Sequence, residues 1–514
     1  MLVDRMPQRL NGPTRPTHAA LALLLAAAIA APALGQSLQS RFDQTVRAMD
    51  VGDAAIAYHV IDLADGLAVA GSDGERAMIP ASNMKLLTTA AAAMVLEPEF
   101  TFVTRMARRD HDLVIIGDGD PAFGDPKILK AMGLDVEDML ARWVKVVERS
   151  GMKRIDRLWI DDRIFDHKRV HPNWPADQLD NWYCAPVAGL NFNNNCLEIF
   201  VTPTDLGQAP RIATRPLKAP VIFNNLARTT RKGAPWAERD PQTRQIAIKG
   251  KVGRGIKRLI YLTLDDPPMM FGRVFADRLE DAGIAVGEIR RVTDSEQVAG
   301  ALPIAEVRTP LAEVMGRCNR DSQNLFAEAL IKRLGHEATG DPGSWSSGAA
   351  AIRMFLSRTI GPDAAKVVVD DGSGMSRDNR ISPKMLTRIL RLMHRAEDDL
   401  AEMYLDSLAE AGEGTLRRRF RGRDMHGEVY AKSGYIRGVI ALSGYVIHDD
   451  QHAYAFSIIL NDWAKPIGDG KKLIDRMVIA IDEHLAEAAS RDQQSVVEEP
   501  AYGGEGEPAG ADPR

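Results

Sequence analysis

The sequence predicts an α+β protein in which one antiparallel sheet with helices packed on it is interrupted by a long β-rich insertion. Three observations support this fold class. An apolar hairpin and an almost wholly apolar helix come first, within residues 54–96. Short strand-like runs separated by Gly, Pro and Asp turns then fill residues 98–295. Helical patterns, three strands and a closing amphipathic helix follow, up to about residue 487.

The N-terminus has the pattern of a secretory signal. Three arginines before residue 16 precede an apolar run over residues 19–33, and the small-residue pattern Ala33-Leu34-Gly35 follows. We therefore expect residues 1–35 to be a cleavable signal peptide. The run is too short for a comfortable membrane span, so no stable span is expected after cleavage; an uncleaved anchor is the alternative.

The first segment of the expected sheet domain covers residues 36–97. Apolar runs at 54–60 and 67–70 are joined through Asp65-Gly66, which is a hairpin signal. The helix that follows, up to Leu96, is apolar on every side, and we expect it to be buried.

The insertion, residues 98–295, is expected to form one or two β-rich domains because its apolar runs are short and bounded by turn residues. The strand-like runs are 113–116, 157–160, 197–201, 246–248 and 259–264.

Residues 296–489 are expected to complete the sheet domain that residues 36–97 begin. Helical patterns come first and three strands follow, before a helix at 471–487. The helices are expected at 311–317, 324–334 and 383–396, and the strands at 428–431, 441–447 and 454–460. Residues 490–514 have little to bury, and we expect a disordered tail.

Composition excludes several classes of protein. The formal net charge of −5 and the 6% aromatic content disfavour a nucleic-acid partner. The three cysteines, Cys184, Cys196 and Cys318, are too few for a disulfide framework, and the sequence leaves open whether the first two pair or remain buried thiols. The eleven histidines show no metal-ligand spacing, so metal catalysis is disfavoured.

The first motif that carries chemistry is Ser82-x-x-Lys85, at the start of the apolar helix. Residues three apart on a helix share a face, so the lysine amine can reach the serine hydroxyl. A serine becomes nucleophilic when a base takes its proton, and burial lowers a lysine pKa far enough to provide that base. The alternative is an ordinary helix-start serine beside a surface lysine.

Two further motifs follow in the chain. Ser322-Gln323-Asn324 opens an apolar helix, and it is either a helix cap or a second hydroxyl with a substrate-orienting amide. Lys432-Ser433-Gly434 lies on a strand, where a cation and a hydroxyl can bind a carboxylate and the glycine permits close approach. The alternative for this third motif is a strand end with a turn.

In this order the three motifs resemble those of β-lactamases and penicillin-binding proteins. Further segments resemble D-alanyl-D-alanine carboxypeptidases of the penicillin-binding protein 4 type (peptidase family S13), over about residues 40–487. These segments are Pro80–Lys85, Gly117–Pro121, Asn324–Glu328, Asp371–Arg377, Gly414–Leu416 with Arg419, and Ala441–Tyr445. Ser433 stands where the family usually has Thr, and Tyr435 where a smaller residue is commoner.

The resemblance implies a penicillin-binding/β-lactamase-like transpeptidase domain, with helices on both faces of its antiparallel sheet and the insertion directly after the first helix. It also implies a serine-type D-Ala-D-Ala carboxypeptidase, with DD-endopeptidase activity as a second outcome, acting on peptidoglycan muropeptides in the periplasm without a cofactor. β-Lactam antibiotics would then trap the nucleophile.

By the same resemblance, the catalytic residues are the nucleophile Ser82, the base Lys85 and the proton relay Ser322. The substrate-binding residues are Asn324, Lys432, Ser433, Gly434 and Tyr435. Two alternatives remain at this point: a β-lactamase, and a non-catalytic cell-wall-binding protein that retains the fold.

Overall fold

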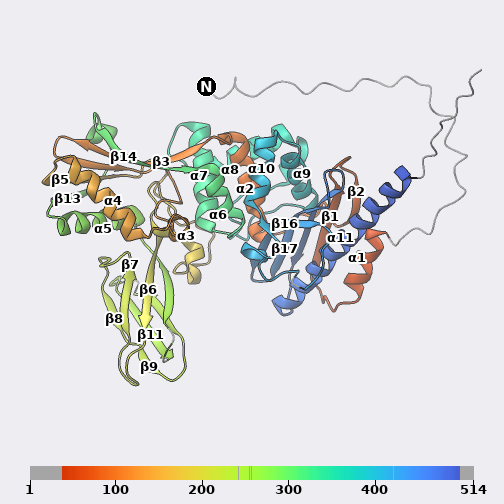
Figure 1. The fold of residues 1–514 in the computed structure, drawn as a ribbon, viewed down its shortest axis with the longest axis horizontal. Coiled ribbons are helices and arrows are strands. Elements are labelled where there is room, and N and C mark those ends of the chain that lie inside the picture. The colour runs from red at the N-terminus through yellow and green to blue at the C-terminus, as the bar shows by residue number, and fades with distance from the viewer. Residues whose placement is uncertain (1–36, 241, 254, 256, 421, 498–514) are drawn as a thin grey trace, which may run out of the picture.

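A computed structural model describes residues 37–497 except 241, 254, 256 and 421 (Figure 1). The expected signal peptide at 1–35 therefore lies outside the described residues. The elements form a sheet domain, a second sheet with its own helices, and a small β module that projects from the rest of the molecule (Figure 1).

The sheet domain contains six antiparallel strands in the order β15-β16-β17-β18-β1-β2. The N-terminal hairpin joins the C-terminal strands because β1 pairs with β18, from Ala55 opposite Asn461 to Asp62 opposite Tyr454. The bounds are β1 Ala55–Asp62, β2 Ala68–Ser72, β15 Ala409–Glu410, β16 Glu428–Ile436, β17 Val439–Ile447 and β18 Ala453–Asn461.

Helices cover both faces of this sheet, as the predicted fold class requires. Successive side chains of β17 point to opposite faces. Ala441 accordingly packs into one core with the helices α2 and α6 to α10, whereas Leu442 packs into another with α1 and α11. Because both faces are covered, β17 and β18 are apolar along almost their whole length.

The helix bounds of this domain are α1 Leu38–Arg47, α2 Met84–Leu96, α6 Leu311–Asn319, α7 Asn324–Thr339, α8 Trp345–Thr359, α9 Pro383–His394, α10 Asp398–Ser407 and α11 Ile467–Val497. The 3₁₀ turns η1 Ala81–Asn83, η6 Pro362–Lys366 and η7 Gly414–Leu416 complete it. Helix α2 is buried from Met84 to Ala93, as its apolar sequence predicts.

The inserted segment contains a five-stranded sheet in the order β13-β5-β4-β3-β14. Helices α4 and α5 pack against it around a core of their own. The bounds are β3 Thr101–Arg109, β4 Asp112–Ile116, β5 Arg154–Asp161, β13 Ala285–Arg291, β14 Leu302–Pro310, α3 Pro126–Ala131, α4 Val136–Arg149, α5 Pro267–Asp281 and η5 Ser295–Val298.

The prediction of a β-rich insertion is incomplete, because the inserted segment also contains the helices α4 and α5. Helix α4 has a capping box between Asp135 and Asp138, and α5 begins at a Pro-Pro pair after the N-cap Asp266. Proline fits the first turn of a helix, where its missing N–H costs nothing, but in a sequence a Pro pair also indicates a loop.

Two expected segment boundaries also differ from the structure. Strand β14 pairs with β3, so residues 302–310 belong to the inserted sheet although the second segment of the sheet domain was expected from residue 296. Helix α11 continues to Val497, past the expected start of a disordered tail at residue 490. Residues 498–514 of that tail lie outside the described residues.

Residues 196–264 form the small β module, which has a separate apolar core. One of its sheets has the order β12-β6-β7, and β11 of the other pairs with β10, β8 and β9. The bounds are β6 Cys196–Thr202, β7 Arg211–Arg215, β8 Phe223–Asn225, β9 Arg228–Thr230, β10 Pro235–Arg239, β11 Ile246–Gly253 and β12 Arg258–Thr263. The turns η2 Ala176–Gln178, η3 Trp182–Cys184 and η4 Asn193–Asn195 precede it.

Cys184, Cys196 and Cys318 are all buried free thiols, so the first two do not form a disulfide in this structure. No helix of the described chain is long and apolar enough to cross a membrane. Nowhere in residues 37–497, apart from the four gaps, do three or more His, Cys, Asp or Glu side chains gather as a metal site would require.

Candidate active site

Ser82 and Lys85 lie together where the turn η1 runs into helix α2. Lys85 Nζ donates to Ser82 Oγ at 3.1 Å, which is the contact that the S-x-x-K spacing predicts. Ser82 is half-buried, whereas Lys85 is fully buried. The lysine is therefore a desolvated amine next to an accessible hydroxyl, and the alternative of a surface lysine is wrong.

The Lys85 ammonium has three acceptors, one for each of its protons. Besides Ser82 Oγ they are Asn324 Oδ1 at 2.7 Å and the Ser373 carbonyl oxygen at 2.9 Å. Burial lowers the pKa of Lys85 to about 8, although nearby acidic groups act in the opposite direction. Near neutral pH a usable fraction of this lysine is therefore a neutral base.

Ser322 is positioned by a left-handed backbone conformation just before helix α7, with φ of +59°. Its Oγ accepts a hydrogen bond from Lys432 Nζ at 2.8 Å. The N-cap of α7 is Gln323, which makes no side-chain cap. The alternative that this motif is only a helix cap is therefore wrong. A left-handed serine is uncommon and costs roughly 1–3 kcal/mol, which the surrounding contacts must offset.

Lys432 is the second buried cation of the site. It donates to Ser322 Oγ and, at 2.8 Å, to the Ser433 carbonyl oxygen. Burial, and then the positive charge of Lys85, hold the pKa of Lys432 well below its usual value. The two lysines thus lie close enough for the charge of Lys85 to act on Lys432, and a bound anion would stabilise both charges.

Strand β16 lies directly against the turn that carries Ser82. A Cβ added at Gly434 would lie 3.0 Å from the Pro80 carbonyl oxygen and 3.2 Å from the Ser82 nitrogen, so only glycine fits without displacement. Strand β15 pairs with β16 only at Tyr430 and Ala431. Within the described part of the chain, no strand pairs with the backbone from Lys432 onward on that side.

The remaining predicted residues lie around this edge. Ser433 is half-buried, and the side chain of Tyr435 is 54% exposed. Tyr435 therefore points largely to solvent. The turn is held to the sheet by Asn83, whose Nδ2 donates to Ser443 Oγ at 2.6 Å. The structure thus brings all eight predicted site residues into one region.

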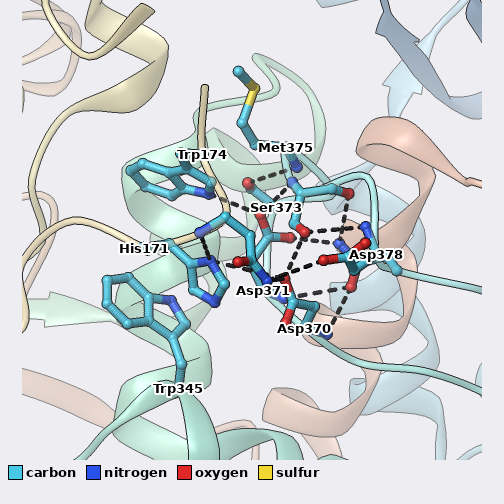
Figure 2. A network of polar contacts seen from close by, with 12 residues as sticks. His171, Trp174, Trp345, Asp370, Asp371, Ser373, Met375 and Asp378 are labelled. Carbon is cyan, nitrogen blue, oxygen red and sulfur yellow. Dashed lines mark hydrogen bonds and ion pairs between the residues drawn. The ribbon is translucent and has the colours of Figure 1, made fainter. Parts of the chain in front are cut away.

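Figure 2 shows a polar network that the sequence analysis did not assign to the site. It fixes the loop at residues 370–379, whose Ser373 carbonyl holds Lys85. Asp371 accepts from the loop N–H groups of Gly374 at 2.8 Å and Ser376 at 2.7 Å, and from Trp174 Nε1 at 2.9 Å (Figure 2). His171 Nδ1 lies 3.8 Å from Asp370 Oδ2.

A second buried carboxylate, Glu328, supports the same loop. It accepts from the N–H groups of Ser373 at 2.9 Å and Gly372 at 3.1 Å, and from Trp345 Nε1 at 2.7 Å. Burial, together with the nearby Asp371 charge, raises the pKa of Glu328 to about 7. Glu328 and Asp371 are therefore positioning residues that set where the Ser373 carbonyl lies.

The inserted segment also reaches the site. Asn324 Nδ2 donates to the Tyr183 carbonyl oxygen at 2.7 Å. Asn324 thus joins Lys85 on one side to the turn η3 on the other. The sequence could not indicate this contact, because a backbone carbonyl leaves no side-chain signal.

Comparison with known proteins gives consistent matches. Residues 38–483 match the D-Ala-D-Ala carboxypeptidase 3 (S13) family. The chain is 31% identical over 434 residues to the D-alanyl-D-alanine carboxypeptidase of Actinomadura sp. (strain R39), covering 79% of this chain and 78% of that protein. It is 24% identical over 437 residues to the penicillin-sensitive carboxypeptidase A of Dictyostelium discoideum, covering 80% and 83%.

A solved structure shares the fold. The crystal structure of penicillin-binding protein 4 from Haemophilus influenzae superposes with a TM-score of 0.69 at 18% identity, covering 87% of this chain and 99% of that one. The family resemblance inferred from the sequence motifs is confirmed by these matches.

Proposed function

The chain belongs to the D-Ala-D-Ala carboxypeptidase 3 (S13) family, and from this premise we propose that it uses Ser82 as the acyl-accepting nucleophile. It is a serine-type peptidase of the D-Ala-D-Ala carboxypeptidase class. The observation that supports Ser82 most directly is the buried Lys85 amine, which binds both Ser82 Oγ and Asn324 Oδ1.

In the acylation step, Ser82 Oγ attacks the carbonyl carbon of the penultimate D-Ala. Its proton passes to neutral Lys85, which the lowered lysine pKa makes available. The negative oxygen that develops is stabilised by the N–H groups of Ser82 and Tyr435. The closeness of Gly434 to the Ser82 nitrogen supports this arrangement, because it sets strand β16 against the nucleophile turn.

Collapse of the tetrahedral intermediate breaks the C–N bond and leaves an ester on Ser82. The terminal D-Ala leaves as an amine after Ser322 Oγ gives it a proton, which Lys432 replaces through its 2.8 Å hydrogen bond. Lys85 then gives up the proton that it took from Ser82, and Lys432 regains one through the water of the site, so that both lysines return to their starting states. Water next attacks the ester, neutral Lys85 takes a proton from that water, and Lys85 passes this proton to Ser82 Oγ as the acid product leaves. Asn324 keeps Lys85 in place through both steps.

The substrate carboxylate is bound by Lys432 and Ser433. A cavity of about 420 Å³ beside Ser433 and Gly434 is lined by basic side chains that include Lys471 and Lys472. A cavity of this charge suits a carboxylate-terminated peptide. The proposed substrates are peptidoglycan stem peptides that end in D-Ala-D-Ala, and penicillin is expected to acylate Ser82 as their mimic.

Two further proposals concern where the enzyme acts and which second bond it cleaves. Residues 1–35 would direct export, and the mature enzyme would work in the periplasm on the cell wall. A cross-linked stem peptide carries the same D-Ala carbonyl, so cleavage there would give DD-endopeptidase activity by the same steps.

The test is D-Ala release from a soluble D-Ala-D-Ala peptide by residues 36–514 and by the Ser82→Ala variant. We expect steady release by the wild type and loss of at least about 1,000-fold in the variant. Rapid hydrolysis of penicillin without D-Ala release would instead indicate a β-lactamase. Binding of the peptide without turnover would indicate a non-catalytic wall-binding protein.

A further inference from the structure

Charge is distributed very unevenly along this chain. Residues 196–264, the β module, contain 13 Lys or Arg and 4 Asp or Glu, a formal charge of +9, whereas the whole chain carries −5. The module contributes none of the residues placed around Ser82, and it projects from the rest of the molecule (Figure 1). Arg239 and Arg244 pair with Asp265, and Lys218 pairs with Asp281, both outside these residues. The positive charge that remains on the module attracts anionic partners.

The outer face of the sheet β12-β6-β7 combines these cations with aromatic rings. Register places Tyr261, Glu198 and Arg215 in one row across the three strands, and Leu259, Phe200 and Ala213 in the next. Tyr261 is 45% exposed and Leu259 39%. The face thus offers flat apolar surface to a ligand.

Cations lie over the central ring of this face. Lys257 Nζ is 4.6 Å from the centroid of the Phe200 ring, and the Arg215 guanidinium carbon is 5.4 Å from it. Arg215 is neutralised by Glu198, to which its Nε donates at 3.0 Å. Within the described residues, Lys257 and Arg211 make no ion pair with a carboxylate, so their charge is available to a ligand.

A pocket of about 320 Å³ lies between this face and the segment that carries Ser322 and Asn324. Glu198, Arg215 and Tyr261 line it from the module. Gln323, which stands between Ser322 and Asn324, lines it on the opposite side, together with Trp182 of η3. A polymer whose end occupies the active site could therefore continue through the pocket onto the module.

We propose that this outer face and the pocket form a docking track for the peptidoglycan strand around the scissile stem peptide. The inference rests on the proposed function, and it adds the polymer, beyond the terminal dipeptide, as the recognised ligand. Sugar rings stack on aromatic faces through their C–H groups. Stem-peptide carboxylates pair with Lys257 and Arg211.

An anionic lipid surface is the other source of negative charge. Membrane docking uses apolar side chains that protrude from a basic face and insert between lipids. Phe200, at the centre of this face, is instead half-buried beneath Lys257 and Arg215. The track also leads toward the segment that carries Ser322 and Asn324, which a lipid surface would not need.

The experiment compares the wild-type protein with the double charge-reversal variant Arg211→Glu/Lys257→Glu. Its matched control is Lys130→Glu/Lys145→Glu, which makes the same change in net charge at two exposed lysines of α3 and α4, outside the module. Each protein is assayed for D-Ala release from a soluble peptide, for D-Ala release from purified sacculi, and for co-sedimentation with sacculi and with vesicles containing phosphatidylglycerol. Arg211→Gln/Lys257→Gln is the milder variant if charge reversal impairs folding.

We expect the charge-reversal variant to keep soluble-peptide activity within about twofold and to lose about tenfold in sacculus binding and in release from sacculi. The control should retain both. Equal binding to sacculi by the charge-reversal variant and by the matched control would overturn the proposal. Binding of the wild type to vesicles but not to sacculi would also overturn it. Absence of release from the soluble peptide would refute the proposed function instead, while the sedimentation result would still decide the docking track.

Discussion

Acylation of Ser82 should become faster as pH rises toward 8 and level off above about 9, because Lys85 must be neutral to accept the serine proton. The Lys85 side chain has no exposed surface, and its burial outweighs the opposing effect of Cys318, Glu328 and Asp371 on its pKa. With a pKa of about 8, the neutral fraction is about 1% at pH 6, about 9% at pH 7 and about half at pH 8. The rate should therefore rise nearly tenfold between pH 6 and pH 7.

The assay is the second-order rate constant for acylation by a fluorescent penicillin, measured between about pH 5.5 and about pH 9.5 at constant ionic strength. Lys85→Met should show no acylation at any pH. Lys145→Met removes an exposed lysine of α4 and should reproduce the wild-type profile.

A rate that stays constant or declines between pH 6 and pH 8, in protein shown by circular dichroism to be folded, would refute Lys85 as the base. Stability gives an independent check on the same group. A lysine whose folded pKa is about 8 and whose ordinary value is 10.5 destabilises the fold fully below pH 8, and this cost disappears as pH rises toward 10.5.

Three substitutions test the surrounding geometry. Gly434→Ala should reduce the acylation rate at least about tenfold with the fold intact, because the added Cβ would press on the turn that carries Ser82. Its control is Gly316→Ala, because Gly316 lies in a helix and has open space around it. This control should leave the acylation rate unchanged and raise the free energy of unfolding by about 0.5–1 kcal/mol. Glu328→Gln should lower the free energy of unfolding, measured in urea, by about 1–3 kcal/mol. The carboxylate oxygens of Glu328 accept from three buried N–H groups, and the NH₂ group of glutamine would face at least one of them without accepting its hydrogen bond. An unchanged urea midpoint would contradict this. Lys432→Ala should lower kcat/KM for the D-Ala-D-Ala peptide by at least about 100-fold, and a loss below about threefold would exclude it as carboxylate ligand and proton donor.

Much of the fold could be predicted because its strands are short apolar runs bounded by turn residues, and because α2 is apolar on every side. Helix α5 was missed since Pro267-Pro268 resembles a loop signal. Strand β14 was not predicted, and its residues were assigned to the sheet domain, because strand pairing depends on distant partners. Sequence patterns give periodicity along the chain but not which strands become neighbours.

At the site, too, contacts set by local spacing could be predicted, whereas contacts between distant segments could not. Ser82 and Lys85 were predictable because three-residue spacing on a helix brings side chains together. The carbonyl oxygens of Ser373 and Tyr183, which hold Lys85 and Asn324, were not, because backbone acceptors occur at every residue. Glu328 was visible in a family-like segment, but its role depends on the loop that it supports.

The central claim is that Ser82 is an acyl-accepting nucleophile. It is tested most directly by the intact mass of residues 36–514 after incubation with benzylpenicillin, with Ser82→Ala in parallel. We expect one added penicilloyl group on the wild type, long-lived enough to be weighed, and none on the variant. An adduct that persists in Ser82→Ala, or a wild type that remains unmodified while the penicillin is left intact, would contradict it. An unmodified wild type with the penicillin hydrolysed would instead indicate a β-lactamase.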